Sequence, residues 1–256
     1  MNESCRLLTL PPEIRAQIWE YVSPGRTIHV QNDQPLRYNA CCSSTSDGQW
    51  AIELNASKTD DRWSKRVHPI CPHVMCILVR NRTALTTDLL LTNRQIYRET
   101  RDLPFKLNAF AFDETKDLVT FLKRLTMEQA RAVERLTLYC ADPPGKWHVD
   151  AFFDLQQHAE FIRSRLNGLK HLTCITGFVR SKDIYVPDGV RSPEAAADYL
   201  KLFGRPHTKL LSATIAGYSQ VRVGHEPSET KHDWFEAEEL NSWANTLEAE
   251  LLRSDI

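Results

Sequence analysis

Glycine is scarce in this chain, which holds nine among its 256 residues. The sequence has no Gly-x-Gly-x-x-Gly run and no phosphate-binding loop, and it also lacks the Gly-x-Ser-x-Gly and His-Glu-x-x-His signatures of hydrolases. These absences make a nucleotide-cradling loop unexpected and favour a non-enzymatic protein. We predict no cofactor.

An excess of one charge sign is also absent. Lys and Arg number 32 against 33 Asp and Glu, so the formal net charge is -1 at pH 7. A near-neutral chain without a basic stripe gives no electrostatic reason to bind nucleic acid. No apolar run approaches the roughly 20 residues that span a bilayer, and the start lacks the pattern of a signal peptide. We therefore predict no nucleic-acid or membrane partner, and a cytoplasmic or nuclear location.

Cysteine is present in an odd number, seven, and the spacing forms no framework of pairs. Without a secretory signal, these residues are expected to be reduced thiols. Cys140 and Cys174 lie in apolar, strand-like segments, where a cysteine is more typical of a buried core than of a nucleophile.

The segment LPPEIRAQIWEYVSPG, residues 10–25, has the pattern of a sharply bounded amphipathic helix. Its two prolines suit a first turn, where a missing amide hydrogen costs nothing, and Ser23-Pro24-Gly25 ends it. Apolar residues recur every four positions on one side, with a tryptophan beside them. They are Ile14, Ile18, Val22 and Trp19. Charged residues fall mostly on the opposite side and are expected to face solvent. They are Glu13, Arg15 and Glu20.

Strands and helices alternate along the rest of the chain. The patterns predict strands at 26–31, 109–112, 134–140, 170–179 and 210–223. They predict helices at 84–101, 114–125, 150–168, 192–204 and 236–254. Crossovers of this length favour parallel pairing, so we predict an α+β (or α/β) fold with a mixed sheet, faintly similar to leucine-rich repeats. We expect a single domain, 1–256, with a polar, mainly loop insert at 32–66 and strand–helix units over 113–256.

The first predicted helix resembles an F-box in its Leu-Pro-x-Glu-Ile start. More closely, the chain resembles a large fungal group of uncharacterised proteins that begin with LPxEIRxxIW and continue, after an insert, with a block like LLLTNRQIYRETRDLPFKLNAFAF. The two blocks stand here at residues 7–22 and 89–112, within an F-box-like region at 7–112. The resemblance implies a non-enzymatic protein-interaction module whose first helix binds a Skp1-type adaptor of a ubiquitin ligase. About 60 residues separate the blocks here, whereas an F-box is a compact motif.

The residues expected to bind the partner are those of the first helix's apolar side. They are Leu10, Pro11, Ile14, Ile18, Trp19 and Val22. Burying each large apolar side chain is worth on the order of 1.5–3 kcal/mol, so this surface requires a cover. The sequence leaves two covers open: the adaptor, or the chain's own second block.

Two His-x-x-Cys pairs lie in VHPICPHVMC, residues 67–76, and offer ligand types that suit zinc. The candidate ligands are His68, Cys71, His73 and Cys76. On a strand over 73–79, however, His73 and Cys76 would point to opposite faces and could not share one ion. The favoured interpretation is a core cysteine with surface histidines, and we predict no bound metal.

An alternative function is a small enzyme or small-molecule-binding protein of a fungal metabolic pathway. It would use a pocket between the sheet and the insert, lined by loop-borne aromatic and histidine side chains. The candidates are Trp50, Trp63, His68 and Trp147.

The second predicted helix has a basic face formed by Arg94, Arg98 and Arg101. We expect this face to be solvated or, alternatively, to dock a peptide or phosphate.

Overall fold

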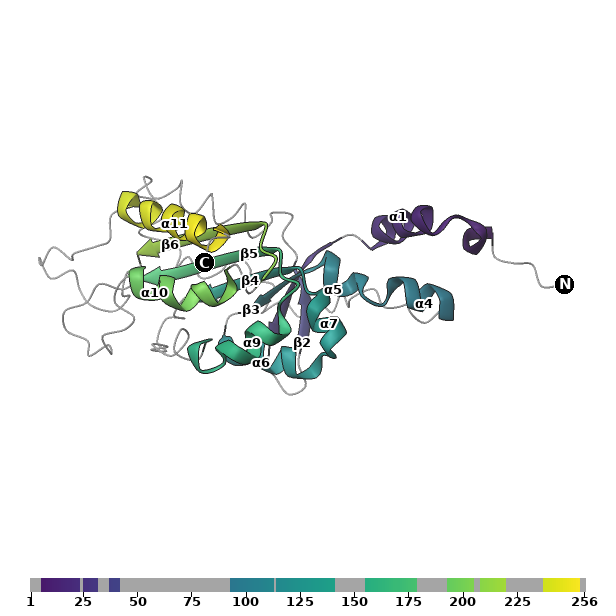
Figure 1. Cartoon of the computed structure of the whole chain (residues 1–256), viewed down its shortest axis with the longest axis horizontal. Coiled ribbons are helices and arrows are strands. Elements are labelled where there is room, and N and C mark those ends of the chain that lie inside the picture. The colour runs from purple at the N-terminus through teal and green to yellow at the C-terminus, as the bar shows by residue number, and fades with distance from the viewer. Residues whose placement is uncertain are drawn as a thin grey trace, which may run out of the picture.

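Figure 1 shows a computed structural model of the chain. The residues that the structure describes are 6–23, 25–31, 37–41, 93–112, 114–140, 155–178, 193–204, 208–219 and 237–253. The segments 50–54 and 73–79, whose patterns also suggest strands, lie outside these ranges.

In the described part of the chain, six strands form one sheet with the order β2-β1-β3-β4-β5-β6. Its strands are β1 Thr27–Gln31, β2 Arg37–Ala40, β3 Ala109–Phe112, β4 Arg135–Cys140, β5 His171–Phe178 and β6 Ser212–Ser219. Strand β2 pairs antiparallel with β1, and every other neighbouring pair is parallel. The sheet is therefore mixed.

The described helices are η1 Arg6–Thr9, α1 Pro12–Val22, α4 Arg94–Thr100, α5 Leu103–Leu107, α6 Thr115–Arg124, α7 Met127–Ala132, α9 Ala159–Arg165, α10 Pro193–Leu200, η4 Lys201–Phe203 and α11 Ala237–Leu252. Those that lie between parallel strands are the crossover helices. Helices α6 and α7 lie between β3 and β4, α9 between β4 and β5, and α10 with η4 between β5 and β6. This arrangement confirms the predicted α+β fold with a mixed sheet and helical crossovers.

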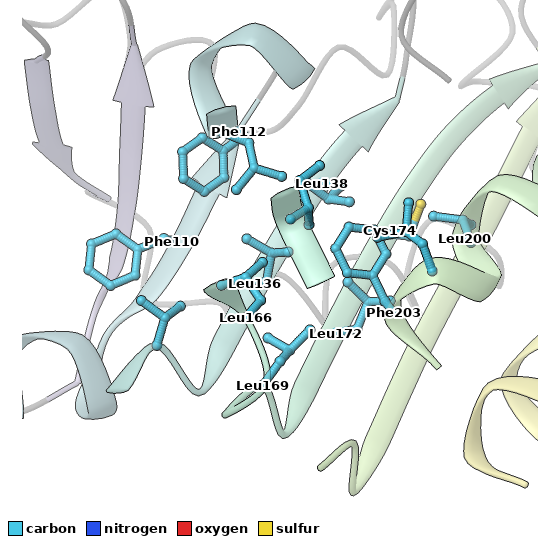
Figure 2. Packing of buried hydrophobic residues seen from close by; sticks show 14 of the residues in the cluster. Phe110, Phe112, Leu136, Leu138, Leu166, Leu169, Leu172, Cys174, Leu200 and Phe203 are labelled. Atoms are coloured by element: carbon cyan, nitrogen blue, oxygen red, sulfur yellow. The ribbon is translucent and has the colours of Figure 1, made fainter. Parts of the chain in front are cut away.

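The hydrophobic core lies between one face of the sheet and these crossover helices (Figure 2). Alternate residues of neighbouring strands point into it because side chains alternate between the faces of a sheet. One row in register is Phe110, Leu136, Leu172 and Ala213, and the next is Phe112, Leu138, Cys174 and Ile215. Cys174 is fully buried here, as the apolar strand pattern predicted.

Phe121 of α6 packs against both phenylalanines of β3, at ring-centroid distances of 4.9 Å from Phe110 and 5.4 Å from Phe112. All three rings are buried. Offset and tilted aromatic pairs at such distances add about 0.5–1.5 kcal/mol beyond the burial of their area. This contact fixes α6 on the sheet.

Helix α11 lies against β6, the last strand of the sheet (Figure 1). Its Ala244, Leu247 and Leu251 belong to the core. The Glu248 carboxylate accepts a hydrogen bond of 2.7 Å from the backbone N–H of Ile215. Partial burial raises the pKa of Glu248, and the bond from Ile215 opposes that rise.

Two local predictions are wrong, and one strand was not predicted. Strand β2, at 37–40, lies within the insert at 32–66, and its backbone pairs with β1 although Arg37 and Asn39 are polar. A helix over 84–101 is wrong near its middle, because the extended Asn93 caps a helix that begins at Arg94, accepting from the N–H of Gln95 at 2.7 Å. The helix over 150–168 has a turn at His158, and α9 begins after it.

Candidate functional site

Helix α1 lies beside α4, away from the sheet (Figure 1). Helix α1 runs into β1, and α4 with α5 runs into β3. Because β1 and β3 are parallel neighbours, both helical segments leave the sheet at the amino ends of their strands. The two blocks of the sequence therefore form one structural unit at that end.

The start of α1 follows from its prolines. Pro12 occupies the first helical position, and the Pro11 carbonyl accepts from the N–H groups of Ile14 and Arg15, both at 3.1 Å. A proline in a first turn sacrifices no hydrogen bond and is already close to the helical φ. Arg15 and Trp19 are one helical turn apart in α1, so their side chains point to the same side of the helix.

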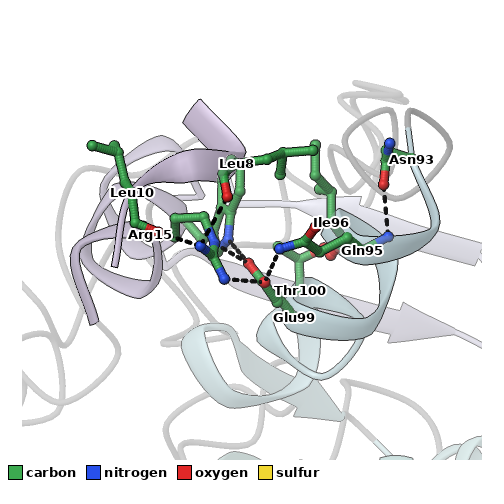
Figure 3. A network of polar contacts seen from close by, with 9 residues as sticks. Leu8, Leu10, Arg15, Asn93, Gln95, Ile96, Glu99 and Thr100 are labelled. Atoms are coloured by element: carbon green, nitrogen blue, oxygen red, sulfur yellow. Dashed lines mark hydrogen bonds and ion pairs between the residues drawn. The ribbon is translucent and has the colours of Figure 1, made fainter. Parts of the chain in front are cut away.

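Glu99 of α4 joins the two helices (Figure 3). Its carboxylate accepts from Arg15 Nη2 at 2.7 Å, from Arg15 Nε at 3.0 Å and from Trp19 Nε1 at 3.0 Å. Gln95, one turn earlier on α4, adds a fourth hydrogen bond at 3.1 Å. Two parallel guanidinium bonds to one carboxylate fix orientation as well as distance.

The other donor group of Arg15, Nη1, turns back to the segment before α1. It donates to the Leu8 carbonyl at 3.3 Å and also to the Leu10 carbonyl. Arg15 is 7 % exposed, and Trp19 is 3 % exposed. One arginine thus binds η1, α1 and α4 together, and we name Arg15, Trp19, Gln95 and Glu99 the anchor cluster.

The anchor cluster shifts the titration of its charged members. The hydrogen bonds from Arg15 and then Trp19 lower the pKa of Glu99 from 4.5 to about 2, against a smaller opposing effect of burial. The bond to Glu99 raises the pKa of Arg15. Both groups are therefore charged across the physiological range, and the ion pair is permanent there.

A second contact joins the blocks at the base of α1. Gly25 lies against the end of α5, where a Cβ on the glycine would stand 2.2 Å from the Leu107 carbonyl oxygen. The Asn108 side chain accepts from the Arg26 N–H at 2.9 Å and donates to the Pro104 carbonyl at 2.7 Å. The path from α1 into β1 is thus fixed by backbone contact with the second block.

The structure divides the predicted partner-binding residues between two sides of α1. Trp19 is buried against α4, whereas Leu10 and Ile18 are half-buried and Pro11 is exposed. Ile14 is 43 % exposed, Val22 is 48 % exposed, and the neighbouring Tyr21 is 87 % exposed. The second block therefore covers part of α1, and we name Ile14, Ile18, Tyr21 and Val22 the outer stripe.

Arg15 and Glu99 were missed by sequence reasoning. A charged residue in an amphipathic helix is expected to face water, so Arg15 was assigned to the wrong side. Its partner is 84 positions away, and no local pattern connects the two. The available signal was the joint occurrence of EIRxxIW and NRQIYRE in the two blocks, which together supply the anchor cluster.

The basic face of α4 is exposed at Arg94 and Arg98. Arg101 pairs with Glu128 at 3.2 Å and approaches Asp102 at 3.9 Å. Within the described ranges neither Arg94 nor Arg98 has an ion pair, so this face is solvated except at Arg101. Its alternative use as a docking strip stays a prediction.

The remaining candidates fall elsewhere. The possible zinc ligands His68, Cys71, His73 and Cys76 lie outside the described residues, as do the possible pocket residues Trp50, Trp63 and Trp147. Among the residues that the structure describes, no group of three His, Cys, Asp or Glu side chains is placed to hold a metal. In the same part of the chain, no helix combines the length and apolar character needed to cross a bilayer.

The chain matches a known family over more than half of its length. The family described as "Domain of unknown function (DUF7730)" matches residues 1–153, a span that contains both blocks, the anchor cluster and strands β1 to β4. Searches for curated relatives and for similar solved structures returned no match. The matched region thus includes every element that holds α1 in place.

Proposed function

This chain belongs to the DUF7730 family, and we propose that it is a non-enzymatic protein-interaction module that presents α1 to a protein partner. The resemblance to F-box helices implies that this partner is a Skp1-type adaptor of a ubiquitin ligase. The two proteins would bind each other in the cytoplasm or nucleus. The observation that carries the proposal is the division of α1: Trp19 is fixed inside, while Ile14, Tyr21 and Val22 remain exposed on the same helix.

The anchor cluster supports this function because it presents a preformed helix. An isolated helix of 11 residues, the length of α1, is marginal in water. Here Arg15 and Trp19 hold it through bonds to Glu99. A partner that binds the outer stripe would not have to order the helix, which removes a large part of the entropic cost of binding.

The outer stripe is not enough by itself to hold a partner. Removing a large apolar side chain from water contributes on the order of 1.5–3 kcal/mol when the burial is complete, and Ile14 and Val22 are already about half covered. Association costs about 4–15 kcal/mol in lost translational and rotational freedom. The partner therefore has to contact surface beyond the outer stripe. An adaptor that surrounds the exposed sides of α1 would do so.

Direct binding to a purified Skp1-type adaptor tests this proposal. We expect the wild-type chain to bind in isothermal titration calorimetry and Ile14→Asp to lose binding by at least about tenfold, because the charge would be buried at the contact. The matched control is Met127→Asp, which places the same charge at an exposed apolar residue of α7. That variant is expected to bind as the wild type does.

Two results would contradict the proposal in different ways. Absence of binding by a folded wild-type chain removes the Skp1-type adaptor as partner. Unchanged binding by Ile14→Asp shows that the outer stripe is not the contact surface. No observation on the described residues favours the small-molecule alternative.

A further inference from the structure

The sequence contains one asparagine that is followed by glycine, at Asn167-Gly168. This pair occupies the centre of the turn between α9 and β5. The N–H of Leu169 closes the turn by donating to the Leu166 carbonyl at 3.0 Å. Both leucines belong to the hydrophobic core, whereas Asn167 is exposed. The turn is therefore fixed at its two ends and presents the asparagine to water.

The fold requires a glycine at position 168. A Cβ there would stand 1.8 Å from the carbonyl oxygen of Arg131 and 2.9 Å from its carbonyl carbon. Arg131 belongs to α7, and both of these atoms are backbone atoms, so neither can rotate away. Any other residue at position 168 would displace the turn or the end of α7.

The same glycine leaves the side chain of Asn167 open to attack by the backbone. Asparagine is a thermolabile residue. Because glycine has no Cβ, the nitrogen of Gly168 can approach the Cγ of Asn167 and close a five-membered ring. Within the described ranges, the Gly168 N–H donates no hydrogen bond that would hold this nitrogen back. The packing against α7 thus requires the neighbour that makes Asn167 reactive.

We propose that Asn167 is a site of spontaneous deamidation and isoaspartate formation in the folded chain. The Gly168 nitrogen gives up its proton and bonds to Asn167 Cγ, the bond from Cγ to the amide nitrogen breaks, and ammonia leaves with that proton. Water then opens the cyclic imide. Cleavage between the Gly168 nitrogen and Cγ gives aspartate, whereas cleavage between that nitrogen and the backbone carbonyl carbon gives isoaspartate.

Isoaspartate would alter the path of the backbone as well as its charge. The chain would run through the former side chain and be one carbon atom longer between residues 167 and 168. Leu166 and Leu169 are fixed in the core, and Gly168 is in close contact with the Arg131 carbonyl, so the added atom has no room unless one of them moves. We expect the junction of α7, α9 and β5 to loosen. No residue of α1 takes part, so this inference does not rest on the protein-interaction function.

Incubation of the whole chain in warm, mildly alkaline buffer, followed by peptide mass mapping and an isoaspartyl methyltransferase assay, tests the proposal. We expect deamidation at Asn167 to be faster than at any other asparagine, with isoaspartate among its products. Asn108 is the internal control, because it is buried and bonded to Arg26 and Pro104, and it should stay intact.

A synthetic peptide of residues 163–171 gives the rate of the same reaction without the fold. Complete conversion of this peptide while Asn167 of the folded chain stays intact would overturn the proposal. Faster deamidation at another asparagine of the folded chain would overturn it as well.

Two substitutions separate the ring closure from the charge that it leaves. Asn167→Gln keeps an amide but would require a six-membered ring, so this variant should form no isoaspartate at position 167. Asn167→Asp adds the charge at an exposed position without lengthening the backbone. Purified isoaspartate protein should unfold about 2 °C or more below freshly prepared Asn167→Asp in thermal unfolding. Equal midpoints would show that the turn has room for the longer backbone, contrary to the inference.

Discussion

The guanidinium of Arg15 and the carboxylate of Glu99 form a two-point ion pair across 84 positions of sequence, with nitrogen–oxygen distances of 2.7 and 3.0 Å. The same carboxylate accepts from the indole of Trp19. Glu99 therefore decides whether α1 is docked, and three predictions concern this contact.

Glu99→Gln should loosen α1 without unfolding the sheet. The amide cannot pair with both donors of Arg15, and a guanidinium that is largely buried would lose its counter-charge. We expect amide hydrogen exchange in α1 to accelerate by about tenfold or more, while exchange in β4 and β5 stays unchanged. Glu128→Gln, which changes an exposed carboxylate of α7, should have no such effect. Unaltered protection of α1 would show that Glu99 does not hold the helix.

Docking of α1 should depend on pH in a defined window. Glu99 has a folded pKa of about 2 against 4.5 for the free side chain. Because the folded value is the lower one, ionised Glu99 stabilises the docked helix fully above pH 4.5, and this contribution is lost as the pH falls towards 2. Amide exchange of α1 measured across this window should show the loss. The Glu99→Gln variant should lack this component, and an identical pH profile in both proteins would count against it.

The two sides of α1 should respond differently to substitution. Trp19→Ala empties a buried site and is expected to cost about 3–5 kcal/mol in the stability of the docked helix. Ile14→Asp alters an exposed position in the first turn, where an acidic residue suits the helix dipole, so its cost should stay within about 0.5 kcal/mol. Denaturant unfolding followed by circular dichroism, with amide exchange of α1, would measure both. A large loss from Ile14→Asp would mean that the outer stripe is buried.

Gly25→Ala should strain the junction between α1 and β1. Its Cβ would meet the Leu107 carbonyl oxygen at 2.2 Å, and that backbone atom cannot rotate away. We expect a loss of about 1–3 kcal/mol, typical of forced overpacking. Gly204→Ala is the control, because its nearest atom is Cδ2 of Leu251 at 3.3 Å, the end of a flexible side chain. Equal losses from the two variants in thermal unfolding would contradict the role given to Gly25.

Glu248 should matter as a hydrogen-bond acceptor rather than as a charge. Glu248→Ala would leave the Ile215 N–H without its bond and should cost about 1–3 kcal/mol. Glu248→Gln keeps an oxygen acceptor and removes a charge that burial disfavours, so its stability should equal or exceed that of the wild type at neutral pH. Glu238→Ala, at an exposed position of the same helix, is the control. Equal losses from the Ala and Gln variants would show that the charge matters instead.

Most of the sheet could be predicted from sequence because its strands are apolar and buried. Phe110 and Phe112 occupy alternate positions of one strand, and Leu136 and Leu138 occupy alternate positions of the next. Each of these strands can therefore be predicted from its own sequence. Strand β2 could not be found in this way. Its sequence RYNA is short and polar, and its extended form depends on pairing with β1.

The sequence predicted the position of the candidate site but not the interactions between its residues. The two blocks located α1 and α4, and the amphipathic pattern located Trp19. The buried ion pair could not be predicted from the sequence. A charged side chain is buried only where it has a partner, and Glu99 is distant from Arg15 in the sequence. A contact of 2.8 Å between His171 Nδ1 and Ser212 Oγ, across β5 and β6, likewise depends on strand register, which composition does not encode.

The position of α11 has a consequence for how separate molecules meet. An edge strand with unpaired amides is a template on which a strand from another chain can add. Along β6, the amide of Ile215 is already occupied by Glu248, so an incoming strand would meet a carboxylate and a helix in place of a donor. Addition of a strand from another chain is therefore obstructed at Ile215, where Glu248 and α11 stand in its path.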